Sequence, residues 1–402
     1  MNIVAANNFL YLRGGSERVL FDEMDWMQGH GHAVNIFGRS TVGGIDLPHS
    51  DLFPPVVDLT SVRGLEKLQA AGHVVYNRGT GKLFALFCDR TLPDIAHFHN
   101  IYAGLTTAVL DVCTQRKLPS VITLHDFKLV CPTYLMLHNG KACRRCSGGR
   151  FYHCLVTRCH KDSLAASLVT TIEAYYNQLL GKYRQADYFI CPSQFMLKIM
   201  LENGIPQEKM YCIPNGVDPS RYTPIYDDNG YFLYLGRLSA EKGIKTLIET
   251  THADVGMTLM VVGEGPEKNT LQELAGDSVS FEGYKSGKEL EKMVQGAAFI
   301  VVPSECNENA SMVVLEAMAY GKPVIGSRMG GIPEQIVDGE TGILFDAGDQ
   351  VQLRSAIQTL VLDKAKRQEM GRAARVRLVE HFSLNQHCEK LMSIYKKAIQ
   401  EN

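Results

Sequence analysis

Two glutamates eight positions apart, Glu308 and Glu316, are the side chains in this sequence best suited to hold a ligand rich in hydroxyl groups. Gly321 followed by Pro323 is a strong stop signal, so we predict a helix over about 311–320. Glu308 would precede this helix. Glu316 would lie inside it among apolar neighbours, where a carboxylate needs a partner. Two glutamates on an ordinary surface helix are the alternative interpretation.

The start of that helix is predicted to bind an anion. The backbone N–H groups of Asn309, Ala310 and Ser311 would point outward there, because the first amides of a helix have no partner within it. A phosphate could sit at this end while Glu308 reaches one side of the ligand. Glu316 could accept hydrogen bonds from a diol such as a ribose.

Two cations stand on a loop flanked by glycines further upstream. Arg237 and Lys242 follow a predicted strand over 231–235, and Gly236 and Gly243 bracket them. A guanidinium can donate two parallel hydrogen bonds to phosphate oxygens, and an ammonium adds a point charge. The pair could therefore neutralise the charge of a departing diphosphate. The glycines permit close approach of the backbone to a ligand. Two solvated loop cations are the alternative.

The first half of the chain holds a second set of candidates. Gly14 and Gly15 follow the first predicted strand and open a helix, which resembles half of a dinucleotide fingerprint, although Gly-x-Gly-x-x-Gly is absent. Their amides could contact a phosphate or a sugar, or could simply form a tight turn. His125 and Asp126 end a later strand, where a polar pair can contact a reacting sugar or cap the strand. His99, after the strand before it, is a candidate for the acceptor site.

Five cysteines fall within 29 residues of a predicted insertion at about 131–162. A Cys-x-x-Cys pair with two more cysteines nearby has the spacing of metal ligands, and a tetrahedral structural zinc is the first choice. Four thiolates would leave no open position for a substrate. An iron–sulfur cluster, or five reduced thiols on a loop, are the alternatives. The predicted ligands are Cys143, Cys146, Cys154 and Cys159, with Cys131 as the fifth thiol.

Strands and helices alternate almost throughout the chain, and these elements must position the candidates. Such alternation predicts parallel sheets joined by crossover helices. Pro214 to Gly216 resembles a turn between domains. We therefore predict an α/β fold with two Rossmann-like, doubly wound parallel-sheet domains, 1–216 and 217–402, facing a cleft. The last helix, about 384–400, could pack on either domain. The predicted strands cover 2–6, 33–37, 95–98, 120–124, 188–191, 211–213, 231–235, 258–262, 279–282, 299–302 and 323–326.

The composition narrows the classes of partner. The 402 residues are too many for one ordinary core, and 45% hydrophobic with 21% charged residues are normal for a globular protein. A formal net charge of −2 argues against nucleic acid. Residues 1–216 carry 21 Lys and Arg against 17 Asp and Glu, whereas 217–402 carry 20 against 26. The more basic half could face anionic lipid or an anionic acceptor.

The sequence also predicts where the protein acts. Its first residues run straight into a strand without the features of a signal peptide. No apolar run approaches the ~20 residues that span a bilayer. We expect a cytoplasmic protein that is peripheral on the inner face of the membrane, with cysteines that do not form disulfides.

In these motifs the chain resembles the family 4 glycosyltransferases, a retaining group with the two-domain GT-B fold. The family's Glu-x7-Glu motif matches Glu308 to Glu316, and its Gly-Arg-x4-Lys-Gly signature matches Gly236 to Gly243. The run Leu-Glu-Ala-Met-Ala-x-Gly-x-Pro-Val matches 315–324 without a gap. The resemblance covers the whole chain and is strongest over 231–345. The order and spacing of the motifs together are highly specific.

The resemblance implies roles for the residues of the second half. Arg237 and Lys242 would bind the donor diphosphate. Glu308 would contact hydroxyls of the transferred sugar, and Glu316 would contact the ribose. The family often has Gly-Phe-Gly after the first glutamate, whereas this chain has Asn-Ala-Ser at 309–311. The identity of the sugar is therefore left open.

The resemblance also implies roles for residues of the first half. Gly14 and Gly15 would lie near the phosphates or the sugar. His125 matches a histidine near the reacting carbon. The cysteine insertion occurs in only some members that resemble this chain, so it does not bear on the reaction.

The expected function is transfer of a sugar from a nucleoside diphosphate sugar, such as a UDP- or GDP-sugar, to an acceptor hydroxyl with retention. The acceptor would be a glycan or a lipid-linked glycan of surface polysaccharide assembly. No catalytic divalent metal is expected, since Asp-x-Asp is absent. A nucleotide-sugar epimerase, a phosphorylase on a similar fold, and a non-catalytic binding protein that uses the cysteine module are the alternatives.

Overall fold

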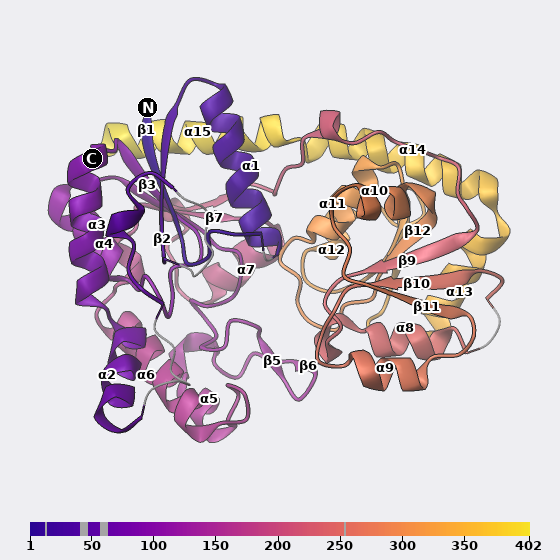
Figure 1. Cartoon of the computed structure of the whole chain (residues 1–402), viewed down its shortest axis with the longest axis horizontal. Helices are drawn as coiled ribbons and strands as arrows, with labels where there is room; N and C mark the ends of the chain where they lie inside the picture. Colours follow the sequence, from indigo (N-terminus) through magenta and orange to yellow (C-terminus); the bar gives the residue numbers. More distant parts are fainter. Residues whose placement is uncertain (13, 41–46, 57–62, 253–254) are drawn as a thin grey trace. The chain divides into compact units, whose positions relative to one another are not determined.

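The computed structural model describes residues 1–12, 14–40, 47–56, 63–252 and 255–402, and it divides the chain into two compact units. The first unit contains Met1–Met136, Arg144–Pro214 and His387–Asn402. The second unit contains Leu137–Cys143 and Asn215–Gln386. Figure 1 shows the course of the chain, and each unit is described here by itself.

A six-stranded parallel sheet is the centre of the first unit, with strand order β2-β1-β3-β4-β7-β8. All residues of β3, β4 and β7 are buried, as is typical of strands covered on both faces. The strands are β1 (Asn2–Asn7), β2 (Ala33–Gly38), β3 (Ile95–Phe98), β4 (Ser120–Thr123), β7 (Tyr188–Cys191) and β8 (Met210–Cys212). The helices are α1 (Gly15–Gly29), α2 (Gly64–Val75), α3 (Arg78–Thr91), α4 (Ala108–Arg116), α5 (Tyr152–Val156), α6 (Leu164–Leu179), α7 (Gln194–Glu202) and most of α15 (Leu384–Glu401).

The two faces of this sheet have different cores, because side chains alternate along each strand. On one face, Phe98 packs with aromatic residues that include Phe37, Phe84 and Phe87. On the other face, Ile95 packs with apolar residues of α15 that include Tyr395. His97 and His99 follow Ile95 at intervals of two, so both point to the side that α15 covers. Two histidine rings are therefore buried on this face of the sheet.

The second unit has a sheet of six parallel strands in the order β11-β10-β9-β12-β13-β14. Figure 1 shows α10 and α11 on one side of this sheet and α8 and α9 on the other. The strands are β9 (Tyr231–Leu235), β10 (Thr258–Val262), β11 (Val279–Gly283), β12 (Ala297–Val302), β13 (Val324–Ser327) and β14 (Gly342–Phe345). The helices are α8 (Ile244–Thr250), α9 (Lys268–Leu274), α10 (Gly287–Gly296), α11 (Met312–Ala319), α12 (Ile332–Gln335), α13 (Gln350–Leu362) and α14 (Lys364–His381).

The strands predicted from the sequence are confirmed, and none of their ends differs by more than two residues. The sequence prediction omitted β14 and the two-stranded antiparallel hairpin of β5 (Leu137–His138) and β6 (Lys141–Ala142). The predicted insertion does not form one block, because the hairpin groups with the second unit and the segment from Arg144 with the first. None of the described helices combines the length and apolar character that crossing a bilayer requires.

Candidate active site

Each sheet has a point where the direction of strand succession reverses, and the candidate residues gather at these points. In the second unit, β9 lies between β10 and β12, so the chain leaves β9 toward one edge of the sheet and returns through β12 toward the other. The loops after β9 and β12 therefore diverge and leave a crevice at the carboxyl ends of the strands, the usual ligand site of such sheets. Arg237 and Lys242 follow β9, and Glu308 follows β12.

Close backbone packing fixes the loop that carries the two cations. Gly263, after β10, has a φ of 145°, and a Cβ added to it would lie 1.8 Å from the carbonyl oxygen of Gly236. Gly243 has a φ of 67°, and its Cβ would lie 1.9 Å from the carbonyl oxygen of Pro303. Only glycine fits both positions, because a side chain would force the three loops apart.

The guanidinium of Arg237 is exposed and makes no ion pair or hydrogen bond with any described residue. Its backbone is fixed, since the hydroxyl of Tyr234 donates to the Arg237 carbonyl at 2.9 Å, and the amide of Leu238 donates to the carbonyl of Glu264 at 3.0 Å. A cation on a rigid loop with an uncommitted side chain is well placed to bind an anionic ligand.

Lys242 and Glu308 form an ion pair that joins the two loops. The Lys242 ammonium lies 2.6 Å from Oε1 of Glu308, which also accepts a hydrogen bond of 2.7 Å from the hydroxyl of Ser304. Burial raises the pKa of Glu308, but the charge and hydrogen bond of Lys242 outweigh it, so the carboxyl pKa lies below its usual value. Burial lowers the pKa of Lys242, and Glu308 more than restores it. The pair is therefore charged at neutral pH.

A glycine turn after β13 supports the backbone of Glu308. Gly331 donates its amide to the Glu308 carbonyl at 2.7 Å. Gly330 has a φ of 59°, and a Cβ there would lie 2.0 Å from the same carbonyl oxygen. Lys242 and Ser304 thus hold the carboxylate of Glu308, and this turn holds its backbone.

The start of α11 differs from the prediction in one respect. The amide of Ser311 does not point outward, because it donates to Oε1 of Gln335 at 3.0 Å, and Nε2 of Gln335 donates back to the Ser311 carbonyl at 3.0 Å. Of the three backbone N–H groups predicted to bind an anion, only those of Asn309 and Ala310 remain candidates. Glu316 lies inside α11 as predicted and is half-buried. Gln335 is itself anchored, since Arg377 of α14 donates to its carbonyl.

In the first unit, the reversal of strand order falls between β1 and β3. Gly14 caps α1 in an extended conformation that any residue could adopt, so its backbone angles do not demand glycine. The first turn of α1 already contains an acid, the buried Glu17, which accepts a hydrogen bond from Asn7. A carboxylate at this helix start competes with a phosphate, so Gly14 and Gly15 are better suited to contact a sugar hydroxyl.

His125 stacks on His99 beyond the ends of β4 and β3, with ring centroids 5.0 Å apart. Nε2 of His125 lies 2.7 Å from Nδ1 of His99, so one ring donates to the other. Burial lowers the pKa of His125 to about 4 and the pKa of His99 well below its usual value, so both are neutral at pH 7. Burial also raises the pKa of the adjacent Asp126 to about 6, although the hydroxyl of Tyr102 and the amide of Lys128 donate to its carboxylate.

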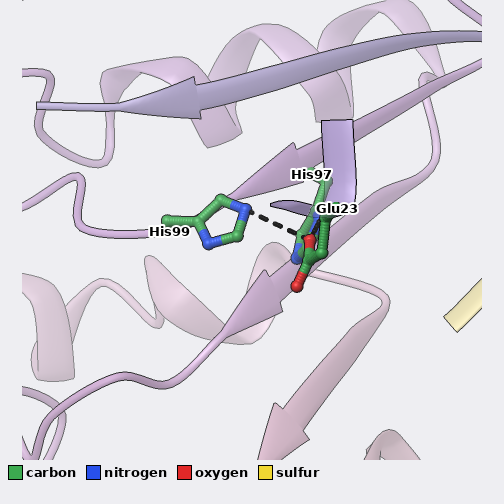
Figure 2. Close-up of side chains that lie close together, drawn as sticks. All are labelled: Glu23, His97 and His99. Carbon is green, nitrogen blue, oxygen red and sulfur yellow. Dashed lines mark ion pairs between the residues drawn. The ribbon is translucent and has the colours of Figure 1, made fainter. Parts of the chain in front are cut away.

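Behind the stacked rings, Glu23 of α1 is 2% exposed and faces three histidines. Figure 2 shows Glu23 with His97 and His99; its Oε2 lies 3.5 Å from Nδ1 of His97 and 3.7 Å from Nε2 of His99. Its Oε1 lies 2.9 Å from Nε2 of His387. The hydroxyl of Tyr395 lies 2.6 Å from Nδ1 of His97.

His387 carries the charge that balances Glu23. Its Nε2 faces the Glu23 carboxylate and its Nδ1 faces the carbonyl of Pro214 at 2.7 Å, so both nitrogens need a hydrogen. Burial lowers the pKa of His387, but the hydrogen bond and charge of Glu23 outweigh it and raise the pKa above its usual value. We assign an imidazolium to His387. An N–H on Nε2 of His99 then faces Glu23, His99 Nδ1 accepts from His125, and Nδ1 of His125 is left as an acceptor.

Glu23, His97 and His99 are also the one group of three metal-ligating side chains in the described ranges whose donor atoms lie within 4.8 Å of one another. Two histidines and a carboxylate could hold zinc. Two observations weigh against it: the imidazolium of His387 already balances the carboxylate, and the Tyr395 hydroxyl occupies Nδ1 of His97. The arrangement fits a hydrogen-bonded network better than a metal centre.

The cysteines of the predicted insertion are not part of this network. All eleven in the chain are free thiols, and no three of them bring their sulfur atoms within 4.8 Å of one another in the described residues. Cys146 and Cys154 are buried together with Phe151, and Cys159 packs against them. Cys143 is not part of this cluster. Cys143 groups with the second unit, whereas Cys146, Cys154 and Cys159 belong to the first.

Several residues that shape the site were not found from the sequence. Glu23, His387, Gln335 and Gly330 belong to no motif, and each lies far along the chain from the residue that it supports. The one available signal was the alternation of His97 and His99 with apolar residues, which placed two polar rings on a core face.

Comparison with known proteins gives two family matches that together cover most of the chain. The model of Glycosyltransferase Family 4 matches residues 13–221, and that of Glycosyl transferases group 1 matches residues 220–377. The first alone covers more than half of the chain. The junction at 220–221 lies close to the boundary between the two units.

Individual relatives are more distant. The sulfoquinovosyl transferase SQD2 of Arabidopsis thaliana is 31% identical over 211 residues, which is 48% of this chain and 41% of that protein. The alpha-D-kanosaminyltransferase of Streptomyces kanamyceticus is 28% identical over 42% of this chain and 46% of its own length. The chain therefore spans less than half of each. A glycogen synthase of Mycobacterium tuberculosis is 27% identical over 78% of this chain and 71% of its own.

Solved structures resemble the chain over its whole length. A sucrose-phosphate synthase from Thermosynechococcus elongatus gives a TM-score of 0.72 at 20% identity and covers 100% of this chain and 99% of its own. HepE of Anabaena, solved in complex with UDP, gives 0.65 at 17% identity over 99% and 100%. At such identities the likeness speaks for the fold alone, and it confirms the predicted GT-B class.

Proposed function

The chain belongs to Glycosyltransferase Family 4, and from this we propose that it transfers a sugar from a nucleoside diphosphate sugar to a hydroxyl of an acceptor. One observation carries the proposal most strongly. At the reversal of strand order in the second sheet, an uncommitted Arg237 and an ion-paired Lys242 and Glu308 face the position where such sheets bind nucleotides. HepE of Anabaena was solved with UDP, which supports the same class of donor.

The proposed mechanism relies on electrostatic stabilisation of the leaving group. The bond between the anomeric carbon and the β-phosphate oxygen breaks, and the acceptor oxygen bonds to that carbon. Arg237 and Lys242 offset the charge that develops on the diphosphate. The acceptor hydroxyl gives its proton to an oxygen of the departing phosphate on the same face of the sugar, so the configuration is retained. No protein nucleophile is needed.

The other residues have supporting roles in this proposal. Glu308 accepts hydrogen bonds from hydroxyls of the transferred sugar, and Glu316 accepts them from the ribose. Asn309 and Ala310 offer amides near the donor, and Gly14 and Gly15 leave room for the sugar. His125, neutral with Nδ1 as an acceptor, orients a hydroxyl near the reacting carbon.

The acceptor that we propose is a glycan or a lipid-linked glycan of surface polysaccharide assembly. Such an acceptor would bring the protein to the cytoplasmic face of a membrane. A structural zinc at the four cysteines is a separate proposal, which metal analysis of the purified protein tests directly. Stoichiometric zinc that is lost on Cys154→Ser would support it, and zinc-free, fully folded protein would contradict it.

Substitution of Arg237 and Lys242 distinguishes an effect on turnover from an effect on the free energy of unfolding. Arg237→Ala should lower turnover about 100-fold or more while the free energy of unfolding stays within about 0.5 kcal/mol of the parent, because the guanidinium has no intramolecular partner. Lys242→Ala should lower turnover similarly but also cost about 1–3 kcal/mol, because it leaves Glu308 without its counter-charge. Donor hydrolysis and urea unfolding measure the two effects.

Lys292→Ala is the matched control, since Lys292 is an exposed cation of the same unit, on α10. It should change neither turnover nor stability. Full activity of both Arg237→Ala and Lys242→Ala would rule out the proposed site.

A further inference from the structure

Helix α6 presents an apolar stripe to solvent. Its exposed side chains in the first three turns are Leu164, Ala165, Leu168 and Ile172, and Leu179 continues the stripe near the end. At 3.6 residues per turn these positions fall within an arc of about 100°. Single exposed leucines are common on protein surfaces, but a contiguous row along one helix marks an interaction site.

The charged side chain of α6 lies in the protein interior. Glu173 is the one charged residue of this helix; it is 2% exposed and accepts a hydrogen bond from the ammonium of Lys128. The fold thus supplies a partner for the carboxylate in the interior and leaves the outer face of α6 without charge. A surface helix that faces water would have the opposite pattern.

Neighbouring helices also carry exposed apolar side chains. Figure 1 shows α2 and α5 beside α6, and both pack against it. Leu65 and Leu68 on α2 are 86% and 72% exposed, and Val156 on α5 is 72% exposed. Tyr152, also exposed, anchors α5 to α6, because its amide donates to the hydroxyl of Tyr175 at 3.2 Å.

A cationic segment is attached to this apolar face. Residues 144–161, which belong to the same unit as α6, contain five Lys and Arg and no Asp or Glu. Phe151 packs on Tyr175 of α6 with ring centroids 5.4 Å apart, so the segment is fixed to the helix. Arg144 is partly neutralised by Glu202, and Asp162 follows the segment. The exposed cations of the segment are Arg144, Arg145, Arg150, Arg158 and Lys161.

We propose that α6, with α2, α5 and the basic segment, is a docking surface for an anionic lipid bilayer. An apolar helix face beside clustered cations suits the boundary between acyl chains and anionic headgroups, where both contributions add. A soluble protein partner would not need five cations on a segment that packs against the helix. The inference rests on the proposed function in one respect: a lipid-linked acceptor is what would make such docking useful.

Cosedimentation with vesicles tests the proposal. The parent protein should bind vesicles that contain phosphatidylglycerol and phosphatidylcholine, and should bind pure phosphatidylcholine vesicles much more weakly. The double variant Leu168→Glu with Ile172→Glu should weaken binding to the anionic vesicles about tenfold or more, because two apolar contacts are replaced by repelled carboxylates. Glutamate is a good helix former, so α6 should remain folded.

Leu362→Glu is the matched control, since Leu362 is 85% exposed at the end of α13 in the second unit. It should bind vesicles like the parent. Arg158→Glu with Lys161→Glu should also lose binding, and raised salt should weaken the parent's binding. Lys292→Glu, an exposed cation on α10, is the control for the charge reversals.

Absence of vesicle binding by the parent, or equal binding by the α6 double variant, would overturn the proposal. Self-association that the double variant abolishes, without any vesicle binding, would overturn it in favour of a second copy of the chain. Donor hydrolysis in the absence of lipid is measured on the same samples. Its failure with intact vesicle binding would refute the proposed function and leave the docking surface standing.

Discussion

The charge on Glu23 shows how single residues can support the reacting region from behind. Burial raises the pKa of this carboxyl, but the hydrogen bond from His387 and the neighbouring histidines outweigh it and lower the pKa. The same carboxylate lies 3.7 Å from Nε2 of His99, so its charge favours a hydrogen on that nitrogen and leaves Nδ1 of His99 to accept from His125. Glu23, His99 and His387 are positioning residues in this account, since they act on the reaction through His125.

The pH dependence of the free energy of unfolding tests the ion pair between His387 and Glu23. The raised pKa of His387 stabilises the fold fully below its ordinary value of 6.5, and this contribution is lost as pH rises through the folded-state value. His387→Gln should therefore cost about 3 kcal/mol at pH 6 and clearly less at pH 9. Urea unfolding at both pH values measures the difference. His381→Gln, at an exposed histidine on α14, should show no such trend.

An equal cost of His387→Gln at both pH values would contradict the assignment of an imidazolium. The lowered pKa values of His97, His99 and His125 act in the opposite sense, because the unfolded chain takes up protons below pH 6.5 that the folded chain refuses. The stability of the parent protein should accordingly fall as pH decreases from 6.5 toward 4.

At the scale of elements, turns place the functional side chains as much as strands do. Gly330→Ala adds a Cβ 2.0 Å from the Glu308 carbonyl at a φ of 59°. It should lower donor affinity about tenfold or more and destabilise the fold by about 3 kcal/mol, although no ligand-binding group is removed. Donor titration and urea unfolding measure both effects.

Gly339→Ala is a close control for this substitution. Gly339 has a φ of 81°, and a Cβ there meets no atom within 4 Å. It carries the cost of left-handed backbone, about 1–2 kcal/mol, without touching Glu308. Equal donor affinity in the two variants would show that the turn does not position Glu308.

Whether an element could be predicted depended on how strong the pattern in its own local sequence is. Strands such as β9 and β12 are continuous runs of aliphatic and aromatic residues, a pattern that depends on local sequence alone. β14 was missed because its four residues, Gly342–Phe345, begin with glycine and have no long apolar run. The role of Gln335 could not be predicted, because its contact with Ser311 depends on where α12 and α11 meet in space.

At the scale of the whole molecule, long-range contacts complete the first unit. Residues from His387 onward belong to it, although the whole stretch Asn215–Gln386 separates them from the rest of that unit along the chain. Leu391 and Tyr395 pack on the same sheet face as Ile3 and Ile95. Motif order predicted the family and indicated candidate donor-binding residues. The return of the chain to the first unit, which supplies the partner of Glu23, followed only from the fold.

The most direct test of the central claim is a titration of the purified protein with a panel of UDP-, GDP- and ADP-sugars, followed by assay of donor hydrolysis. We predict that one donor binds saturably and is slowly hydrolysed by the parent protein, and that Arg237→Ala abolishes both. Conversion of the donor to an epimer without release of nucleoside diphosphate would point to an epimerase. Failure of every donor to bind the folded protein would contradict the assignment of a glycosyltransferase.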